Sequence, residues 1–192
     1  MPRTREQFKE MKDERKSSIL SAALILFSTS EKVSIDSICE KLKCSHGIIY
    51  HYFSNVNRIY DYLLASENFK ALKSELFDQN EGSSYDKIEH IFSVCLDVSQ
   101  KNREKVAYLN ILIKDNEKGS LYSLLSKFIK DGQAAGSVIG GEPSQIVDSL
   151  FLLLKGLYLS LLLEKHPDVK VPSLETVMQL IRKPTSFSRQ TL

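Results

Sequence analysis

The stretch that decides the fold is SIDSICEKLKCSHGIIYHYFSN, residues 34–55. It holds two short segments, 35–42 and 46–53, whose apolar residues recur at helical spacing. Lys43 and Cys44 separate the two segments and leave room for only a tight turn. The pattern therefore predicts two short helices joined by a turn.

The residues at the segment ends support this prediction. Ser34 and Ser45 each precede a helical segment and are suited to N-cap positions. Ile49 and Phe53 lie four residues apart, so both point to the same side of the second helix. This arrangement is typical of the helix-turn-helix, whose second helix enters the DNA major groove. Any small three-helix bundle would show similar spacing, so periodicity alone leaves DNA binding as one alternative.

The rest of the chain also has helical periodicity, without a Val/Ile/Thr-rich strand between turn signals. We therefore predict an all-α fold. Three N-terminal helices would be followed by six C-terminal ones. The expected helices cover residues 13–30, 34–42, 46–53, 58–77, 85–100, 103–115, 121–130, 143–165 and 173–182.

Composition narrows the class of protein. The 192 residues are 42% hydrophobic and 26% charged, as in an ordinary folded protein. The net charge of +2 divides into +3 over residues 1–60 and −1 over 61–192, so nucleic-acid contacts are expected in the N-terminal third. Three cysteines without a C-x-x-C pair fit reduced thiols, and we expect a cytoplasmic protein. The apolar run 150–163 is shorter than the roughly 20 residues that span a bilayer, which favours a buried helix.

The strongest motif is SHGIIYHYF, residues 45–53. It resembles the recognition helix of the tetracycline-repressor (TetR) family of bacterial regulators, written Ser-x-Gly-x-(Leu/Ile)-Tyr-x-(Tyr/His)-Phe. Ala22, Ala23 and Phe27 are similar to the family's first helix, and the specific resemblance covers residues 13–64. It implies a ligand-responsive, sequence-specific transcriptional regulator, more often a repressor, that binds a palindromic double-stranded DNA operator as a homodimer.

Elementary chemistry explains why these residue types suit DNA. Gly47 allows close backbone approach, Ser45 can bond a phosphate, and the Ile48 side chain can contact a thymine methyl group. Tyr50 and His51 offer hydrogen-bonding groups to phosphates or base edges. The predicted DNA-binding residues are Ser34, Ser45, His46, Gly47, Ile48, Tyr50, His51, Tyr52, Asn55, Asn57 and Arg58.

Three residues depart from the family pattern. Lys43 stands where the family usually has glycine, so the turn is either strained or differently shaped. Val56 replaces a common lysine, which leaves a phosphate contact to Asn57 or Arg58. Asp36 places a negative charge near the phosphates. Together these differences predict weaker or more salt-sensitive DNA binding.

For the C-terminal helices the resemblance implies ligand binding and dimerisation, with the last two helices forming a four-helix bundle with a partner. The expected dimer residues are Leu150, Leu154, Leu157, Leu161, Leu174, Val177, Met178 and Ile181. The expected pocket, for an unidentified and mostly apolar small molecule, is lined by Phe92, Cys95, Tyr108, Asn110, Phe128, Phe151 and Tyr158.

The resulting organisation is an N-terminal arm (1–12), a helix-turn-helix domain (13–64), a ligand-binding and dimerisation domain (65–183) and a flexible tail (184–192). The four histidines form no H-E-x-x-H motif, and metal-ligand clusters, Gly-rich phosphate loops and G-x-S-x-G are absent from the sequence. We therefore expect no enzyme activity, no cofactor, no metal site and no membrane partner. The alternative is a helical protein-interaction module that has lost operator binding.

Overall fold

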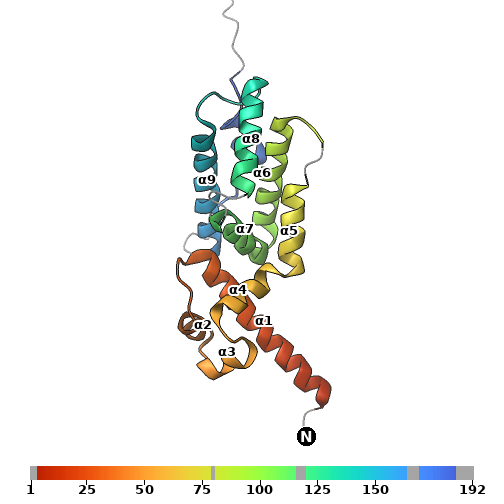
Figure 1. The fold of residues 1–192 in the computed structure, drawn as a ribbon, viewed down its shortest axis with the longest axis vertical. Coiled ribbons are helices and arrows are strands. Elements are labelled where there is room, and N and C mark those ends of the chain that lie inside the picture. Colours follow the sequence, from red (N-terminus) through yellow and green to blue (C-terminus); the bar gives the residue numbers. More distant parts are fainter. Residues whose placement is uncertain (1–3, 79–80, 116–119, 164–168, 185–192) are drawn as a thin grey trace, which may run out of the picture.

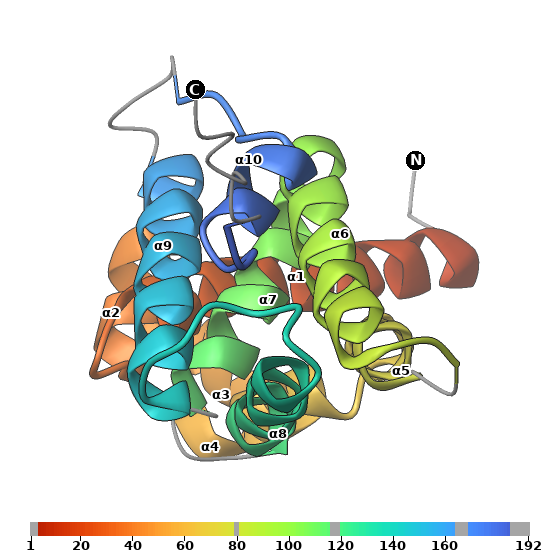
Figure 2. The same ribbon diagram turned by 90° about the horizontal axis from the view of Figure 1, so that it is seen from above.

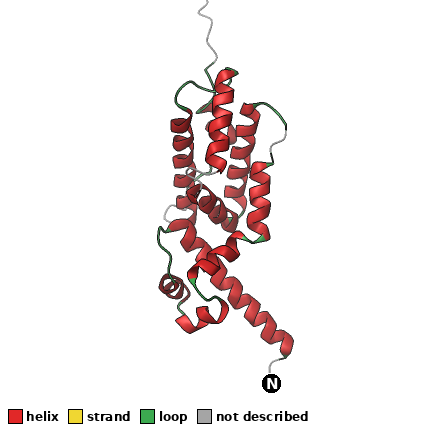
Figure 3. Cartoon of the chain, viewed as in Figure 1, coloured by secondary structure: helices red, strands yellow, loops and turns green. Residues whose placement is uncertain are grey.

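A computed structural model of the protein describes residues 4–78, 81–115, 120–163 and 169–184. Over these residues the chain forms ten α-helices and no strand, which confirms the all-α prediction (Figure 3). An isolated antiparallel β-bridge joins Val138 to Arg182. Residues 1–3 of the expected arm and 185–192 of the expected tail lie outside the described residues.

The first helix is longer than predicted. Helix α1 runs Arg5–Thr29, and Thr4 caps it in a reciprocal pair of hydrogen bonds with Gln7. Its first turns project away from the remaining helices (Figure 1). The predicted start of this helix at residue 13 is therefore wrong: the capping box starts the helix at Arg5, so the residues expected to form the arm are helical from Arg5 onward.

Helices α2 (Ile35–Leu42), α3 (His46–Tyr52) and α4 (Val56–Leu64) lie together beside α1 (Figure 1). The single helix predicted over 58–77 is in fact two, α4 and α5 (Glu67–Phe77). Ser66 causes the break, because its hydroxyl accepts a hydrogen bond from the Phe69 amide and starts a new helix. This extra boundary raises the predicted nine helices to ten.

The C-terminal helices are α6 (Ser84–Lys101), α7 (Arg103–Asp115), α8 (Ser120–Ala134), α9 (Pro143–Leu163) and α10 (Leu174–Gln179). Figure 2 shows α10 between α6 and α9. Helix α7 packs against α1, α5, α6 and α9, which makes it the central element of the fold. Residues 106–113 of this helix are all buried, so it is enclosed on every side there.

Helix α9 is 21 residues long, which is longer than the apolar run 150–163 on which the expectation of a buried helix was based. Among the described residues, α9 is long and apolar enough to cross a bilayer, judged by length and composition alone. Within its most apolar stretch, 39% is buried inside the protein. The core helix of a soluble protein meets the same criterion. Leu150, Leu154 and Tyr158 face the protein core, whereas Leu152 is 68% exposed.

Helices α2 to α4 are held to the C-terminal helices through the end of α1. The Asn110 amide of α7 donates a 2.7 Å hydrogen bond to the Ser28 carbonyl, and both residues are buried. One turn further along α7, the Lys114 ammonium donates to the carbonyls of Phe27 and Ser30, at 3.3 and 2.5 Å. A cation at a helix C-terminus is favourable, because the terminal carbonyls lack intrahelical partners.

Asn110→Ala tests this attachment. The substitution leaves the buried Ser28 carbonyl without its donor, so we expect the free energy of unfolding to fall by about 1–3 kcal/mol. Asn68→Ala is the matched control, because that amide makes only an exposed 3.3 Å bond to Glu104 and its loss should change stability by no more than about 0.5 kcal/mol. Urea unfolding followed by circular dichroism measures both, and equal losses would contradict the assignment.

Candidate nucleic-acid interface

The turn between α2 and α3 is built on a left-handed residue. Lys43 has φ 49° and ψ 49°, and its backbone amide bonds the carbonyls at the end of α2. The Cys44 amide then bonds the Cys39 carbonyl at 3.0 Å, which closes the turn. Of the two alternatives predicted for this non-glycine position, the strained conformation is the correct one.

Helix α3 divides cleanly into an inner and an outer face. Ile49 and Phe53, the residue that follows the helix, are buried in the core, as predicted. Tyr50 is 56% exposed, and Ser45, His46, Gly47 and His51 are also exposed. A β-carbon at Gly47 would contact only the Ser45 hydroxyl, at 4.0 Å, so the backbone here is open to a large partner.

The two predicted N-cap serines behave differently. Ser34 forms a capping box with Ser37, so its hydroxyl oxygen accepts from the Ser37 amide at 3.1 Å. Ser45 occupies the N-cap position of α3, but its side chain makes no capping bond. The prediction that its side chain caps the helix is therefore wrong. The Ser45 hydroxyl is not used by its own helix, which leaves it able to bond a phosphate.

His46 is joined to Asp36 across the turn. The Nε2 atom of His46 lies 2.6 Å from Oδ1 of Asp36, and both side chains are more than half exposed. This contact links the start of α2 to the start of α3. It uses one ring nitrogen of His46, so the Nδ1 atom is what this residue can present to DNA. Sequence reasoning assigned the two residues separately and missed the contact, since they are ten positions apart.

The remaining predicted DNA contacts lie where α3 passes into α4. Ile48 and Tyr52 are half-buried, and Asn55, Asn57 and Arg58 are exposed. Asn55 caps α4 by accepting from the Arg58 amide at 3.0 Å. The Arg58 guanidinium lies 4.0 Å from the Asp61 carboxylate, a weak exposed pair that a phosphate can displace. These side chains reach the same end of the domain as α3.

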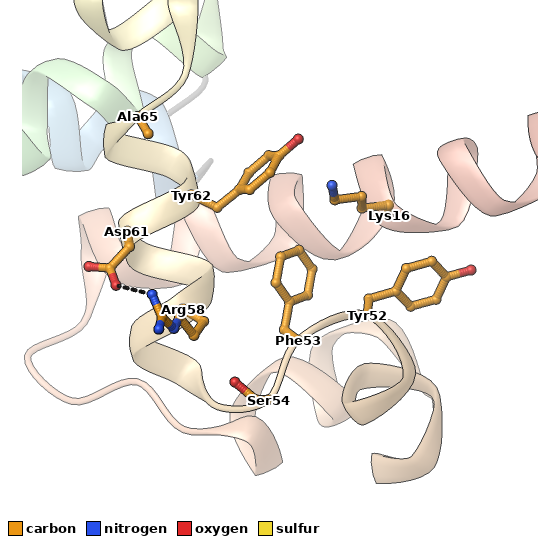
Figure 4. A pocket seen from close by; sticks show the side chains of 8 residues that line it. All are labelled: Lys16, Tyr52, Phe53, Ser54, Arg58, Asp61, Tyr62 and Ala65. Carbon is orange, nitrogen blue, oxygen red and sulfur yellow. Dashed lines mark ion pairs between the residues drawn. The ribbon is translucent and has the colours of Figure 1, made fainter.

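A cleft of about 500 Å³ borders this end of the domain (Figure 4). Lys16 of α1 enters it with its ammonium 4.0 Å from the centre of the Tyr62 ring and 5.9 Å from that of Phe53. Ser54 and Arg58 line the same cleft. The rings fix the direction of the lysine by cation–π attraction. Sequence analysis did not find Tyr62 or Ser54, because only the fold brings α4 beside the middle of α1.

Lys16 is the inner end of a basic stripe. Arg5, Lys9 and Lys12 precede it at helical spacing on one face of α1, and all three are exposed. The four acidic residues of these turns, Glu6, Glu10, Asp13 and Glu14, lie on other faces of the helix. The balanced composition of this segment therefore conceals a separation of charge that a helix creates.

The residues predicted for an apolar ligand pocket are core residues of α6 to α9. All seven are buried. Burial raises the pKa of the Cys95 thiol to about 11. Burial and the adjacent Cys95 raise the pKa of Tyr158 well above its ordinary value. Two of the seven border clefts: Tyr108 lines one of about 170 Å³ and Asn110 one of about 530 Å³. A pocket formed by the whole set stays a prediction.

The predicted dimer residues require a correction. The structure buries six of them inside the chain's own core: Leu150, Leu154, Leu157, Val177, Met178 and Ile181. Leu161 and Leu174 are half-buried. Because α9 is apolar on nearly every side, its hydrophobicity did not reveal which face turns outward. The outward face carries Gln145, Ser149, Leu152, Gly156 and Leu163.

Within the described residues, no group of three or more His, Cys, Asp or Glu side chains is placed to hold a metal ion.

Solved structures share the fold of this chain, whereas the sequence comparisons find no match. No family model matches the chain, and no curated protein is similar to it in sequence. Among solved structures, a HlyIIR mutant protein has a TM-score of 0.61 at 14% identity, covering 96% of this chain and 100% of its own. A tetR-family transcription regulator from Shewanella sp. PV-4 has a TM-score of 0.51 at 18% identity, covering 88% and 99%. The chain has the TetR fold.

A third solved structure with the TetR fold is the ketosteroid transcriptional regulator KstR2 of Mycobacterium tuberculosis. It has a TM-score of 0.53 at 13% identity and covers 88% of this chain and 96% of its own. Each alignment extends over the C-terminal helices as well as the helix-turn-helix. The agreement therefore includes the part of the chain beyond residue 64, where the sequence resemblance ends.

Lys43→Gly tests the left-handed turn. Relief of about 1–2 kcal/mol of strain should exceed the 0.5–1 kcal/mol that glycine loses in chain entropy, so we expect stability to rise by about 0.5–1 kcal/mol. Lys41→Gly is the matched control: it lies within α2 and should lower stability by about 1 kcal/mol. Denaturant unfolding distinguishes the two signs. A loss of stability in both variants would show that Lys43 is not strained.

Proposed function

We propose that this protein is a ligand-responsive, sequence-specific DNA-binding transcriptional regulator that acts as a homodimer. The observation that carries the proposal is the division of α3, where Tyr50 and His51 are exposed while Ile49 is buried, within a TetR fold whose match covers 96% of the chain. Repression by occlusion of a promoter is the mode that the family resemblance favours. The similar solved structures are transcriptional regulators, which supports a cytoplasmic protein without enzyme activity.

On this proposal α3 lies in the major groove. Tyr50 and His51 carry the polar groups that reach bases or phosphates, and Ile48 offers an apolar surface to a thymine methyl. Ser45 and Arg58 contact phosphates on either side of the helix. The absence of a lysine at position 56 is offset by Arg58, whose exposed guanidinium is two residues further along α4.

The basic stripe of α1 extends the same surface. Lys16 is directed toward the cleft beside Tyr52 and Phe53, and Lys12, Lys9 and Arg5 continue outward from it. A row of cations on one helical face can follow a phosphate backbone, and each contact steepens the dependence of binding on salt. The stripe compensates for the negative charge that Asp36 places near the groove.

The homodimer is supported by the outer face of α9. Leu152 and Leu163 are exposed on it, and the small exposed residues Ser149 and Gly156 lie on the same face. Beside this face, Leu153 and the exposed Leu180 line a largely apolar groove of about 420 Å³. A second copy would cover these side chains and place two α3 helices on successive major grooves, about 34 Å apart.

Selection of bound sequences from a random duplex library tests the proposal. We expect the wild-type protein to enrich a palindromic sequence. Tyr50→Phe and His51→Ala should each weaken binding to it by about fivefold or more, because each removes one hydrogen-bonding group. His90→Ala is the control, since this exposed histidine lies on α6 and bonds the Glu75 carbonyl. No enrichment at low salt would favour the interaction-module alternative.

Leu152→Lys tests the dimer face. Burial of an unpaired charge between two copies is costly, so we expect the dimer to dissociate while the helical content stays unchanged. Ala71→Lys, on the exposed side of α5, should leave the dimer intact. Analytical ultracentrifugation gives both masses. A wild-type monomer would refute the homodimer, and a dimeric Leu152→Lys variant would place the interface elsewhere.

A further inference from the structure

A polar cleft of about 530 Å³ lies where the C-terminal end of α1 meets α7 and α9. Ser30 and Glu31 line it from the α1 side, Asn110 and Lys114 from α7, and Lys155 and Leu159 from α9. Its volume is within the range of small-molecule sites. The cleft therefore lies at the junction between α1, which leads into the helix-turn-helix, and helices α7 and α9.

Two ammonium groups share this cleft. Lys114 and Lys155 are both half-buried, on different helices. Partial burial, together with the positive charge of Lys114, lowers the pKa of Lys155. Glu31 is the only acidic residue among the described lining residues, and it is exposed at the edge of α1. Two cationic side chains and one acidic side chain therefore line a site that is partly shielded from water.

We propose that this cleft binds a small anion, a carboxylate or a phosphate, between Lys114 and Lys155. An anion there forms charge-assisted hydrogen bonds with both ammonium groups and removes their mutual repulsion. The Ser30 and Asn110 side of the cleft is polar, so the ligand's remaining groups are expected to be polar as well. This ligand class differs from the mostly apolar molecule that the sequence predicts.

The site contacts the end of α1, which leads to the helix-turn-helix. A regulatory role for this site depends on the proposed function. Lys114 also binds the Phe27 and Ser30 carbonyls at the end of α1, immediately before the loop that leads to α2. An anion that attracts the Lys114 ammonium weakens these bonds. The end of α1 then shifts relative to α7, and the position of α3 shifts with it. Anion binding and operator binding should oppose each other to the same extent.

The first experiment measures anion binding without DNA. Isothermal titration with inorganic phosphate and with glutarate, at constant ionic strength, tests the two anion classes separately, and the uncharged diamide of glutarate is the control ligand. We expect at least one anion to bind the wild-type protein and Lys155→Arg, and to bind Lys155→Gln at least about tenfold more weakly. Lys130→Gln, on the exposed face of α8, should bind as the wild type does.

Failure of both anions to bind the wild type overturns the proposal. Equal affinity in Lys155→Gln and wild type overturns it too, because the anion would then lie elsewhere. Thermal unfolding of each variant shows that the fold is retained. Since no DNA is present, this result does not depend on whether the protein is a transcriptional regulator.

The second experiment measures the coupling. Fluorescence anisotropy with the selected operator should show affinity reduced about fivefold or more by saturating anion in the wild type, and unchanged in Lys155→Gln. If the anion binds but operator affinity is constant, the anion site stands and its regulatory role is refuted. If no operator is found, the proposed function fails while the anion site is judged by titration alone.

Discussion

The structure depends on the attachment of α7 to the C-terminal end of α1. Asn110 and Lys114 bind carbonyls of Ser28, Phe27 and Ser30, which a helix terminus leaves without internal partners. The Asn110 bond is buried, so its loss would leave a desolvated carbonyl. These polar contacts help to fix the position of α1, and α1 in turn carries helices α2 to α4. The proposed anion site lies at the same junction, where a small change in one lysine can move a large unit.

Helix α9 shows how one element serves two surfaces. Tyr158 and Leu154 fill the core, whereas Leu152 and Leu163 point outward. A helix that is apolar all round can bury one face in its own chain and leave another for a partner. The exposed face combines leucines with Ser149 and Gly156, and such small residues allow a second helix to approach closely. The homodimer proposal therefore rests on the residues opposite to those that the sequence pattern selects.

The candidate DNA surface combines parts that are far apart in the chain. Tyr50 and His51 come from α3, Arg58 from α4, and Lys16 from the middle of α1. Lys16 is placed by the exposed ring of Tyr62 and the buried ring of Phe53, so this aromatic pair orients a cation at the edge of the domain (Figure 4). Asp36 reduces the positive charge of this surface and holds His46 at the same time. The negative charge of Asp36 weakens attraction to phosphates, whereas its contact with His46 helps to hold the start of α3 in place.

The sequence by itself determined the helix-turn-helix and the inner face of α3, because local spacing and N-cap residues decide where short helices begin and which side is apolar. It also predicted Ile49 and Phe53 as core residues. It did not determine the break at Ser66, the early start of α1 or the left-handed Lys43, which depend on individual capping bonds and turn geometry. The outward face of α9, the His46–Asp36 contact and the two-lysine cleft were decided only by the tertiary structure. Each of these depends on which helices are neighbours in space, and a one-dimensional pattern of apolar residues carries no information about that.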